Sequence, residues 1–348
     1  MFLASDNSGP VHPRIMDALQ RANSGHAMGY GNDVLTQKAA DRIRAVFEAP
    51  EAAVYFVATG TAANALILAT MAHPFQTIYC APDAHVAVDE CGAPEFYTSG
   101  AKLAHVAGLP DRMTAAALTQ VLAAADTSVH AVQPGPVTIT QVTEWGTLYE
   151  LDEIRAIADV THSYGQKLHL DGARFANAAA ALGCSAAEMS WKQGVDAVSF
   201  GGTKNGCLGV EAVVIFDPDL AWEFELRRKR GGHLFSKNRF LAAQMDAYAS
   251  DDLWLDMARA ANANGSVLAQ ALADLDQVWT YCIRYRRTCC SPRCRAPSMH
   301  ASKMRALSTI ATATRTAIPM RRSGVDWWPT GLWIAARSTS SSIWSGAD

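Results

Sequence analysis

Apolar and polar positions alternate along the chain between two periods, one typical of short strands and one typical of helices. Six short apolar runs predict strands, at residues 53–58, 77–80, 131–133, 168–170, 197–200 and 212–216. Four longer stretches between them predict helices, at residues 62–72, 114–125, 151–164 and 173–182. Strands that alternate with helices long enough to cross back over a sheet predict an α/β fold with a mostly parallel sheet.

The pattern changes after about Gln277. From Trp279 to the end only two acids occur, Asp326 and Asp348, against eleven lysines and arginines, and four of the eight cysteines fall between residues 282 and 294. No helical or strand period persists there. We interpret this as a change of reading frame near Asp276. A natural basic tail rich in Ser and Thr is the alternative, and a metal site is disfavoured because the cysteines lack paired C-x2-C spacing.

Composition narrows the classes of partner. The chain has 348 residues, 49% of them hydrophobic, and a formal net charge of -3 at pH 7. That balance predicts no broad positive field for nucleic acid or for an anionic membrane, so a small-molecule site is expected. The first ten residues carry no basic and apolar leader pattern, and no apolar run approaches the ~20 residues that span a bilayer. We therefore expect a cytoplasmic protein.

Three segments place polar groups just after predicted strands, at residues 59–64, 169–174 and 201–206. In open α/β sheets, ligands bind beyond the carboxyl ends of the strands. In the first segment, Gly60 and Thr61 open a helix, where free backbone N–H groups suit a phosphate. The same pattern is also an ordinary helix N-cap, and it is neither a Walker loop nor a G-x-G-x-x-G fingerprint.

The other two segments offer a carboxylate and an amine. Asp171 stands at the end of a mostly apolar strand, with Arg174 three residues on. A buried carboxylate there needs a cationic partner, so a local Asp171–Arg174 ion pair is the structural alternative to a functional role. Lys204 lies in a glycine-flanked turn, where a solvated surface lysine is the alternative. Together the three segments resemble a phosphate cup, a carboxylate and an amine.

The combination resembles the low-specificity L-threonine aldolases, which are pyridoxal-phosphate enzymes of the aspartate-aminotransferase fold (fold type I). Coverage runs from about residue 4 to about residue 275. Further segments that look like this family, in order, are residues 4–7, 29–33, 84–86, 89–96, 139–141, 143–144 and 232–237.

The resemblance implies roles for the residues of these segments. Lys204 would hold pyridoxal 5′-phosphate as a Schiff base, and Asp171 would keep the pyridinium nitrogen protonated. Gly60 and Thr61 would bind the phosphate, and His85 would stack on the ring face. A satisfied structural histidine is the alternative for His85.

Other residues carry over with weaker support. Arg174 would hydrogen-bond near the phenolic oxygen of the ring or the substrate, and Ser5 would touch the substrate carboxylate. Tyr30, in the substrate site, and Lys237, in the cofactor site, would approach from a neighbouring subunit, within a homodimer or homotetramer whose sites lie at the subunit interface. Glu144 stands where many members of the family have a histidine, so His85 or Glu144 would take the β-hydroxyl proton.

The implied reaction is aldol cleavage of L-threonine, L-allo-threonine and related β-hydroxy-α-amino acids to glycine and an aldehyde. The family's small C-terminal domain supplies an arginine that clamps the carboxylate, and Arg337 cannot be given that role. The alternatives are a cofactor-binding but catalytically impaired product of an altered reading frame, or a related racemase or β-eliminating lyase. We expect an N-terminal arm over residues 1–35, a large domain over 36–250, a connecting helix over 251–278 and an aberrant segment over 279–348.

Overall fold

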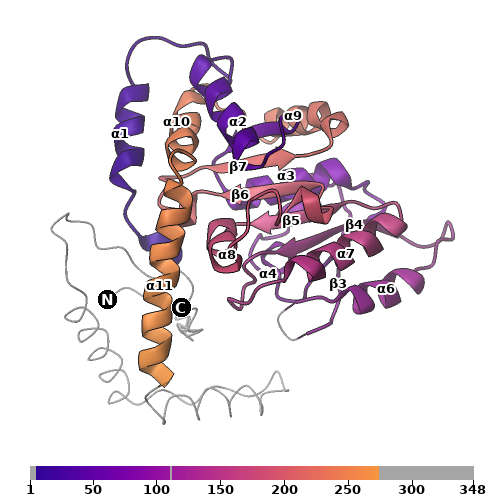
Figure 1. Cartoon of the computed structure of the whole chain (residues 1–348). Coiled ribbons are helices and arrows are strands. Elements are labelled where there is room, and N and C mark those ends of the chain that lie inside the picture. The colour runs from indigo at the N-terminus through magenta and orange to yellow at the C-terminus, as the bar shows by residue number, and fades with distance from the viewer. Residues whose placement is uncertain (1–4, 110–111, 274–348) are drawn as a thin grey trace, which may run out of the picture.

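The computed structural model describes residues 5–109 and 112–273 (Figure 1). The segment predicted to be aberrant, residues 279–348 with its clustered cysteines and Arg337, lies outside the described residues, and so does the end of the predicted connecting helix. The division into domains therefore stays a prediction. Within the described ranges no helix combines the length and the apolar character that crossing a membrane requires.

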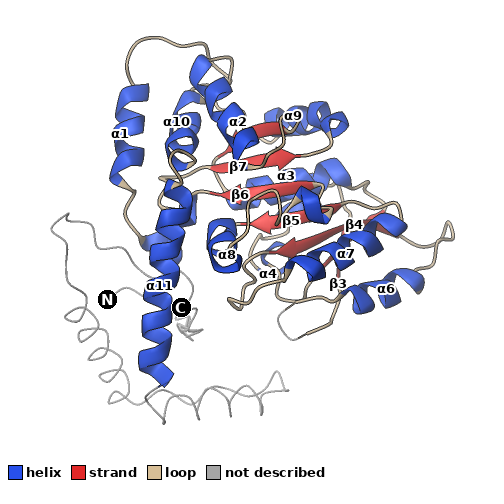
Figure 2. Ribbon diagram, viewed as in Figure 1, coloured by secondary structure: helices blue, strands red, loops and turns tan. Residues whose placement is uncertain are grey.

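A seven-stranded sheet forms the centre of this part of the chain (Figure 2). Its order is β1-β7-β6-β5-β4-β2-β3; β7 runs antiparallel to both of its neighbours, and all other neighbouring pairs are parallel. The predicted mostly parallel α/β sheet is confirmed. The strands are β1 (Ala53–Val57), β2 (Gln76–Cys80), β3 (Lys102–His105), β4 (Gln133–Thr140), β5 (Leu168–Gly172), β6 (Ala197–Gly201) and β7 (Glu211–Ile215).

Two strands differ from the expectation. The run at residues 131–133 predicts a short strand, but β4 begins at Gln133 and continues to Thr140. Pro134 and Pro136 lie inside it, and because proline cannot donate to a ladder, its presence argues against a central strand when only the sequence is considered. The edge strand β3 was not predicted, since both of its ends are exposed and it contains no apolar run.

The four predicted helices correspond to α3, α6, α7 and α8, with bounds that differ by at most two residues. The helices are α1 (Pro13–Ala22), α2 (Val34–Val46), α3 (Gly60–Met71), α4 (His85–Val88), α5 (Ala93–Tyr97), α6 (Ala115–Ala123), α7 (Leu151–Ser163), α8 (Phe175–Leu182), α9 (Ala221–Arg230), α10 (Arg239–Tyr248) and α11 (Leu253–Ala273). Two short 3-10 helices matter for the site, η1 (Asp6–Ser8) and η3 (Thr203–Asn205).

Helices cover both faces of the sheet (Figure 1). One face packs against α3 and its neighbours α5 and α9, and the other packs against a larger apolar core that includes α2, α7, α8, α10 and α11. Because side chains alternate along a strand, β5 sends Leu168 and Leu170 into the larger core, while His169 and Asp171 face α3. On β5, the side that faces α3 is therefore the polar one.

Candidate active site

Hydrogen bonds with two helices that follow it in the chain fix the turn that carries Lys204. The Asn205 side chain donates hydrogen bonds to the Tyr248 hydroxyl and to the Trp254 carbonyl, both at 2.9 Å. The Tyr248 hydroxyl in turn donates to the Gly201 carbonyl at 2.9 Å. These buried bonds connect both ends of the turn to α10 and to the start of α11, so the backbone under Lys204 is held in one conformation.

Lys204 is half-buried, and its amine makes no hydrogen bond or ion pair with any residue that the structure describes. The alternative of a fully solvated surface lysine is thus disfavoured. The turn needs its glycines, because a Cβ on Gly201 would lie 2.4 Å from the Ala173 carbonyl oxygen. The chain thus packs tightly below the turn and leaves the lysine amine free for a ligand.

Asp171 is almost completely buried at the end of β5, with 3% of its surface exposed. One of its carboxylate oxygens accepts from the Asn64 amide at 2.8 Å, and the other accepts from the Ala173 backbone N–H at 3.0 Å. The structure does not contain the local Asp171–Arg174 pair, because the Nε of Arg174 donates to Asp6 at 2.5 Å. Asp171 is therefore held by neutral donors, and its charge remains available to a ligand.

Asn64, on α3, links this carboxylate to His85. Its amide nitrogen donates to Asp171 and, at 2.8 Å, to Glu90, and its oxygen accepts from the Ser199 hydroxyl at 2.7 Å. Glu90 lies 2.8 Å from the Nδ1 of His85. One connected network therefore sets the positions of the buried carboxylate and the imidazole, since each member is satisfied by the next.

The network continues into the sheet through His169. Its two ring nitrogens lie 3.0 Å from the Ser199 hydroxyl and 2.9 Å from the Thr138 hydroxyl. Burial lowers the pKa of His169 to about 4. His169 is therefore neutral at physiological pH, and its ring connects the Thr138 hydroxyl of β4 with the Ser199 hydroxyl of β6.

The titratable groups around His85 change one another's pKa values. The hydrogen bond that His85 makes to the Glu90 carboxylate is the main cause that raises the pKa of His85, and burial opposes it. Burial raises the pKa of Glu90 and that of Glu144, and the charge of Asp171 raises both further. Glu144 accepts from the backbone N–H of His85 at 2.7 Å, so the two residues predicted as alternative bases lie side by side.

Gly60 and Thr61 are the first two residues of α3. The Thr59 hydroxyl accepts from the Ala62 N–H at 3.2 Å and caps the helix. The N–H groups at the first two positions have no carbonyl four residues before them within the helix, so they are available to an anion. The positive end of a twelve-residue helix favours a phosphate at this place.

The N-terminal arm lies against the Lys204 turn, with η1 packed on η3. The His12 N–H donates to the Gly206 carbonyl at 2.9 Å, and Asp6 reaches Arg174. Ser5 caps η1 through its hydroxyl, which accepts from the Asn7 N–H at 3.1 Å. Ser5 and Arg174 are thus placed in the same neighbourhood as Lys204.

Tyr30 and Lys237 lie elsewhere in this chain. The Tyr30 N–H donates to the Ser236 carbonyl at 3.0 Å, and the Lys229 amine lies 4.7 Å from the centre of the Tyr30 ring. Both Tyr30 and Lys237 are exposed, and no contact between described residues joins them to Lys204 or Asp171. Their predicted role at the site of a neighbouring subunit stays a prediction.

Sequence reasoning assigned no role to the residues that hold the site together. Asn64 could have been noticed in the sequence, because it is a polar residue in a helix whose other buried residues are almost all apolar. His169 and Ser199 each interrupt a run of apolar residues in a buried strand. Such positions need hydrogen-bond partners, and period-two alternation assigns them to a single face. Glu90 and Asp6 carry no comparable signal, since both precede or follow irregular turns.

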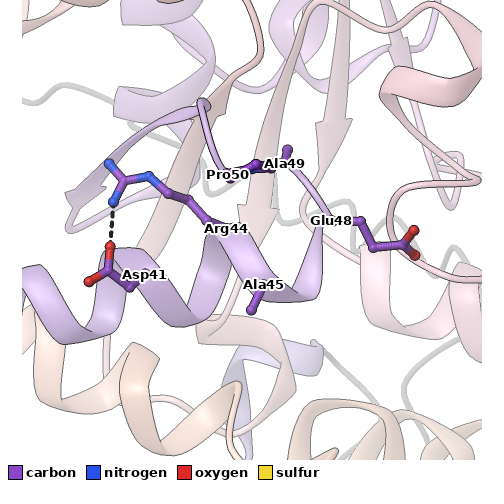
Figure 3. A pocket seen from close by; sticks show the side chains of 6 residues that line it. All are labelled: Asp41, Arg44, Ala45, Glu48, Ala49 and Pro50. Atoms are coloured by element: carbon purple, nitrogen blue, oxygen red, sulfur yellow. Dashed lines mark hydrogen bonds and ion pairs between the residues drawn. The ribbon is translucent and has the colours of Figure 1, made fainter.

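A separate hollow of about 420 Å³ lies at the end of α2 (Figure 3). Its lining consists of Asp41, Arg44, Ala45, Glu48, Ala49 and Pro50. The charged groups there are already paired, since Arg44 contacts Asp41 at 2.7 Å and Glu48 contacts Lys192 at 2.6 Å. The hollow therefore has no free group with which to carry chemistry.

The fold is that of the aminotransferase class of pyridoxal-phosphate enzymes. An aspartate aminotransferase from Thermus thermophilus shares it with a TM-score of 0.58 at 12% identity, covering 77% of this chain and 71% of the other. The model of the beta-eliminating lyase family matches residues 3–282. The chain belongs to the beta-eliminating lyase family.

Similar proteins agree with this assignment. Low specificity L-threonine aldolases of Pseudomonas aeruginosa and of Pseudomonas sp. strain NCIMB 10558 are 44% and 42% identical over 275 residues, or 79% of this chain and 79% of each relative. A threonine aldolase structure from Leishmania major superposes with a TM-score of 0.73 at 29% identity, covering 78% of both chains. The predicted resemblance to the threonine aldolases is confirmed.

Proposed function

We propose that this chain binds pyridoxal 5′-phosphate through Lys204 and cleaves β-hydroxy-α-amino acids, L-threonine and L-allo-threonine among them, to glycine and an aldehyde. The observation that supports it best is a half-buried lysine that has no hydrogen-bond or ion-pair partner among the described residues, in a turn fixed by buried hydrogen bonds. The names of the relatives supply the reaction, since they act as threonine aldolases.

The residues present fit this cofactor. A free amine at Lys204 suits the aldehyde carbon, a buried carboxylate at Asp171 suits a protonated ring nitrogen, and the N–H groups of Gly60 and Thr61 suit the phosphate. His85 suits the ring face, because its Nδ1 is engaged by Glu90 and its ring is about one-third exposed. Amine, acid, anion cup and aromatic ring together match the groups that the cofactor presents.

When bound, the cofactor supplies an electron sink for the bonds at the substrate Cα. The protein must then select the bond and move protons. Asp171, oriented by Asn64, holds a proton on the ring nitrogen. His85 is the better base for the β-hydroxyl, because Glu90 raises its pKa and orients it so that Nε2 faces away from the network. Glu144 holds the backbone of His85 in place.

Arg174 and Ser5 are proposed to bind the substrate. Arg174 is buried and paired with Asp6, so its guanidinium keeps a fixed orientation. A fixed guanidinium can grip a carboxylate or a phenolic oxygen with two hydrogen bonds. Ser5, on the arm that packs along η3, would add a hydroxyl to the same end of the site.

We further propose that the protein is a homodimer or homotetramer in which Tyr30 and Lys237 complete the site of a neighbouring subunit. What supports this is that both residues are exposed and that no hydrogen bond or ion pair between described residues joins them to Lys204. Analytical ultracentrifugation gives the number of subunits. A monomer that is fully active would contradict the shared site.

The test of the proposed function is production of glycine and acetaldehyde from L-threonine by the purified full chain with added pyridoxal 5′-phosphate. Lys204→Ala must abolish it, and Lys192→Ala, at an exposed lysine paired with Glu48, must not. Formation of pyruvate from L-serine without glycine from L-threonine would identify β-elimination instead. This outcome is tested because the chain belongs to the beta-eliminating lyase family. Cofactor binding with neither product would identify the catalytically impaired alternative.

A further inference from the structure

Glu211 is a buried carboxyl group at the level of the site that has no role in the proposed reaction. It is the first residue of β7, with 6% of its surface exposed, and it lies opposite Gly201 of β6 and Val57 of β1. Alternation along β7 puts Glu211 on the same side as Val213 and Ile215, which pack with α3. Glu211 thus lies between the strand that leads to Lys204 and the strand that leads to the α3 N-terminus.

The carboxyl group of Glu211 contacts the backbone of the Lys204 turn directly. The Gly202 N–H donates to one of its oxygens at 2.9 Å, and the Thr203 hydroxyl is a second partner. The Thr203 hydroxyl also accepts from the Val210 N–H at 3.1 Å, which closes the turn onto β7. The two residues that precede Lys204 are thus both fixed by one buried side chain.

The charges of Lys204 and Asp171 act on this group. Burial raises the pKa of Glu211 to about 7; the charge of Lys204 on η3 lowers it, and the charge of Asp171 on β5 raises it. Glu211 in turn contributes to the raised pKa of Cys207 and of Tyr248, on the loop after η3 and on α10. Glu211 makes no ion pair within the described residues, so Lys204 is the cation that favours its charged form.

We propose that Glu211 is a positioning residue for Lys204: its carboxyl group fixes the turn on which the lysine stands, and the charge of the carboxyl group and the charge of the lysine amine each stabilise the other. The proposal rests on the proposed function where it concerns attachment of the cofactor. The coupling itself is a property of the chain without cofactor, and it is reciprocal.

The first consequence concerns the reactivity of Lys204. A neighbouring negative charge holds a lysine amine in its protonated, unreactive form. Glu211→Gln keeps an acceptor for the Gly202 N–H but removes the negative charge near Lys204. At pH 8 the variant should attach pyridoxal 5′-phosphate about threefold faster than the wild type, since a nearby negative charge disfavours the neutral form of an amine.

The second consequence concerns stability and needs no cofactor. A buried carboxyl group with a raised pKa binds its proton more tightly in the folded chain than in the unfolded one. Relative to Glu211→Gln, the wild type should lose stability as pH rises from near 4.5 to about 7, and the difference should be constant above that. The expected change in the ratio of the two unfolding constants is on the order of a hundredfold. In Lys204→Met the loss should extend above pH 7, since the stabilising cation is gone.

Both consequences are measured on the full chain. The rate of attachment is followed from pH 6 to pH 9 by borohydride trapping, with Glu51→Gln, at an exposed carboxylate before β1, as the matched control. Urea unfolding of the apoprotein from pH 5 to pH 8 compares the wild type, Glu211→Gln and Lys204→Met. Faster attachment in Glu211→Gln alone, and a stability loss that moves upward in Lys204→Met, would support the proposal.

The same attachment rates in Glu211→Gln and the wild type, or a stability loss that ends at the same pH with and without Lys204, would overturn it. If Glu211→Gln does not fold, the comparison of Lys204→Met with the wild type decides alone. If the wild type attaches no cofactor at Lys204 but the stability loss still moves in Lys204→Met, the proposed function fails and the coupling stands.

Discussion

Replacing Asp171 by asparagine tests the site at its most buried polar group. Both oxygens of Asp171 accept hydrogen bonds, one from the Asn64 amide and one from the Ala173 N–H. An asparagine offers a single acceptor oxygen, and its NH2 group would face one of these two donors. Because an unsatisfied buried donor costs about 1–3 kcal/mol, we expect the free energy of unfolding to fall by that amount.

The catalytic effect of Asp171→Asn should be larger than its effect on stability. The variant has no negative charge to hold a proton on the cofactor ring, and removing one such fixed electrostatic contact typically lowers kcat by on the order of 10²-fold. The cofactor should still attach, since Lys204 and the α3 N-terminus are unchanged.

The assay is glycine formation from L-threonine at saturating pyridoxal 5′-phosphate, together with urea unfolding of the same preparation. Asp152→Asn, at an exposed position of α7, serves as the matched control and should match the wild type in both. Turnover of Asp171→Asn within a few-fold of the wild type, with the cofactor bound, would refute the role assigned to this carboxylate.

Three further perturbations test the surroundings of the site. Glu90→Gln removes the main cause of the raised pKa of His85, so the midpoint of the His85 ring titration by NMR should move to lower pH, and an unchanged midpoint would contradict the network. His169 is buried with a pKa of about 4, so the wild type should lose up to about 3 kcal/mol of stability as pH falls from 6.5 towards 4. His169→Gln should lose less over that range in urea unfolding, and an equal loss would exclude His169 as the cause. Asp6→Asn leaves the nearly buried Arg174 guanidinium without its carboxylate and should cost about 3 kcal/mol, whereas Asp251→Asn, at an exposed pair with Arg14, should cost less than about 1 kcal/mol. Equal costs for the two would be inconsistent with a buried anchor.

The architecture could be predicted because the hydrophobic period and the length of each segment distinguish strands from helices. The buried apolar runs and the helices between them specified five of the strands, the four crossover helices and the mostly parallel sheet. Pro134 and Pro136 hid the true extent of β4, since prolines argue against a central strand. The edge strand β3 is half-exposed and leaves no apolar run to detect.

Only the site residues that come directly after a predicted strand or at the start of a predicted helix could be predicted from the sequence. Asp171 and Lys204 each come at the end of a predicted strand, and Gly60 and Thr61 open a helix. The topology of the sheet therefore predicts that these residues lie near one another. The contacts that orient them do not follow, because Asn64 on α3, Glu90 in the loop after α4 and Ser199 on β6 meet only through tertiary packing. The partner of Arg174 does not follow either, because Asp6 is 168 residues away in sequence, whereas Asp171, the partner in the structural alternative, is three residues away.

The central claim is that Lys204 is the residue that carries the cofactor, and peptide mapping after borohydride reduction tests it most directly. The full chain is incubated with pyridoxal 5′-phosphate, reduced, digested and analysed by mass spectrometry for the pyridoxyl group. We expect the label on the peptide that contains Lys204 and no label there in Lys204→Ala. Stoichiometric labelling of another lysine, such as Lys237, or an undiminished reducible adduct in Lys204→Ala, would contradict the account.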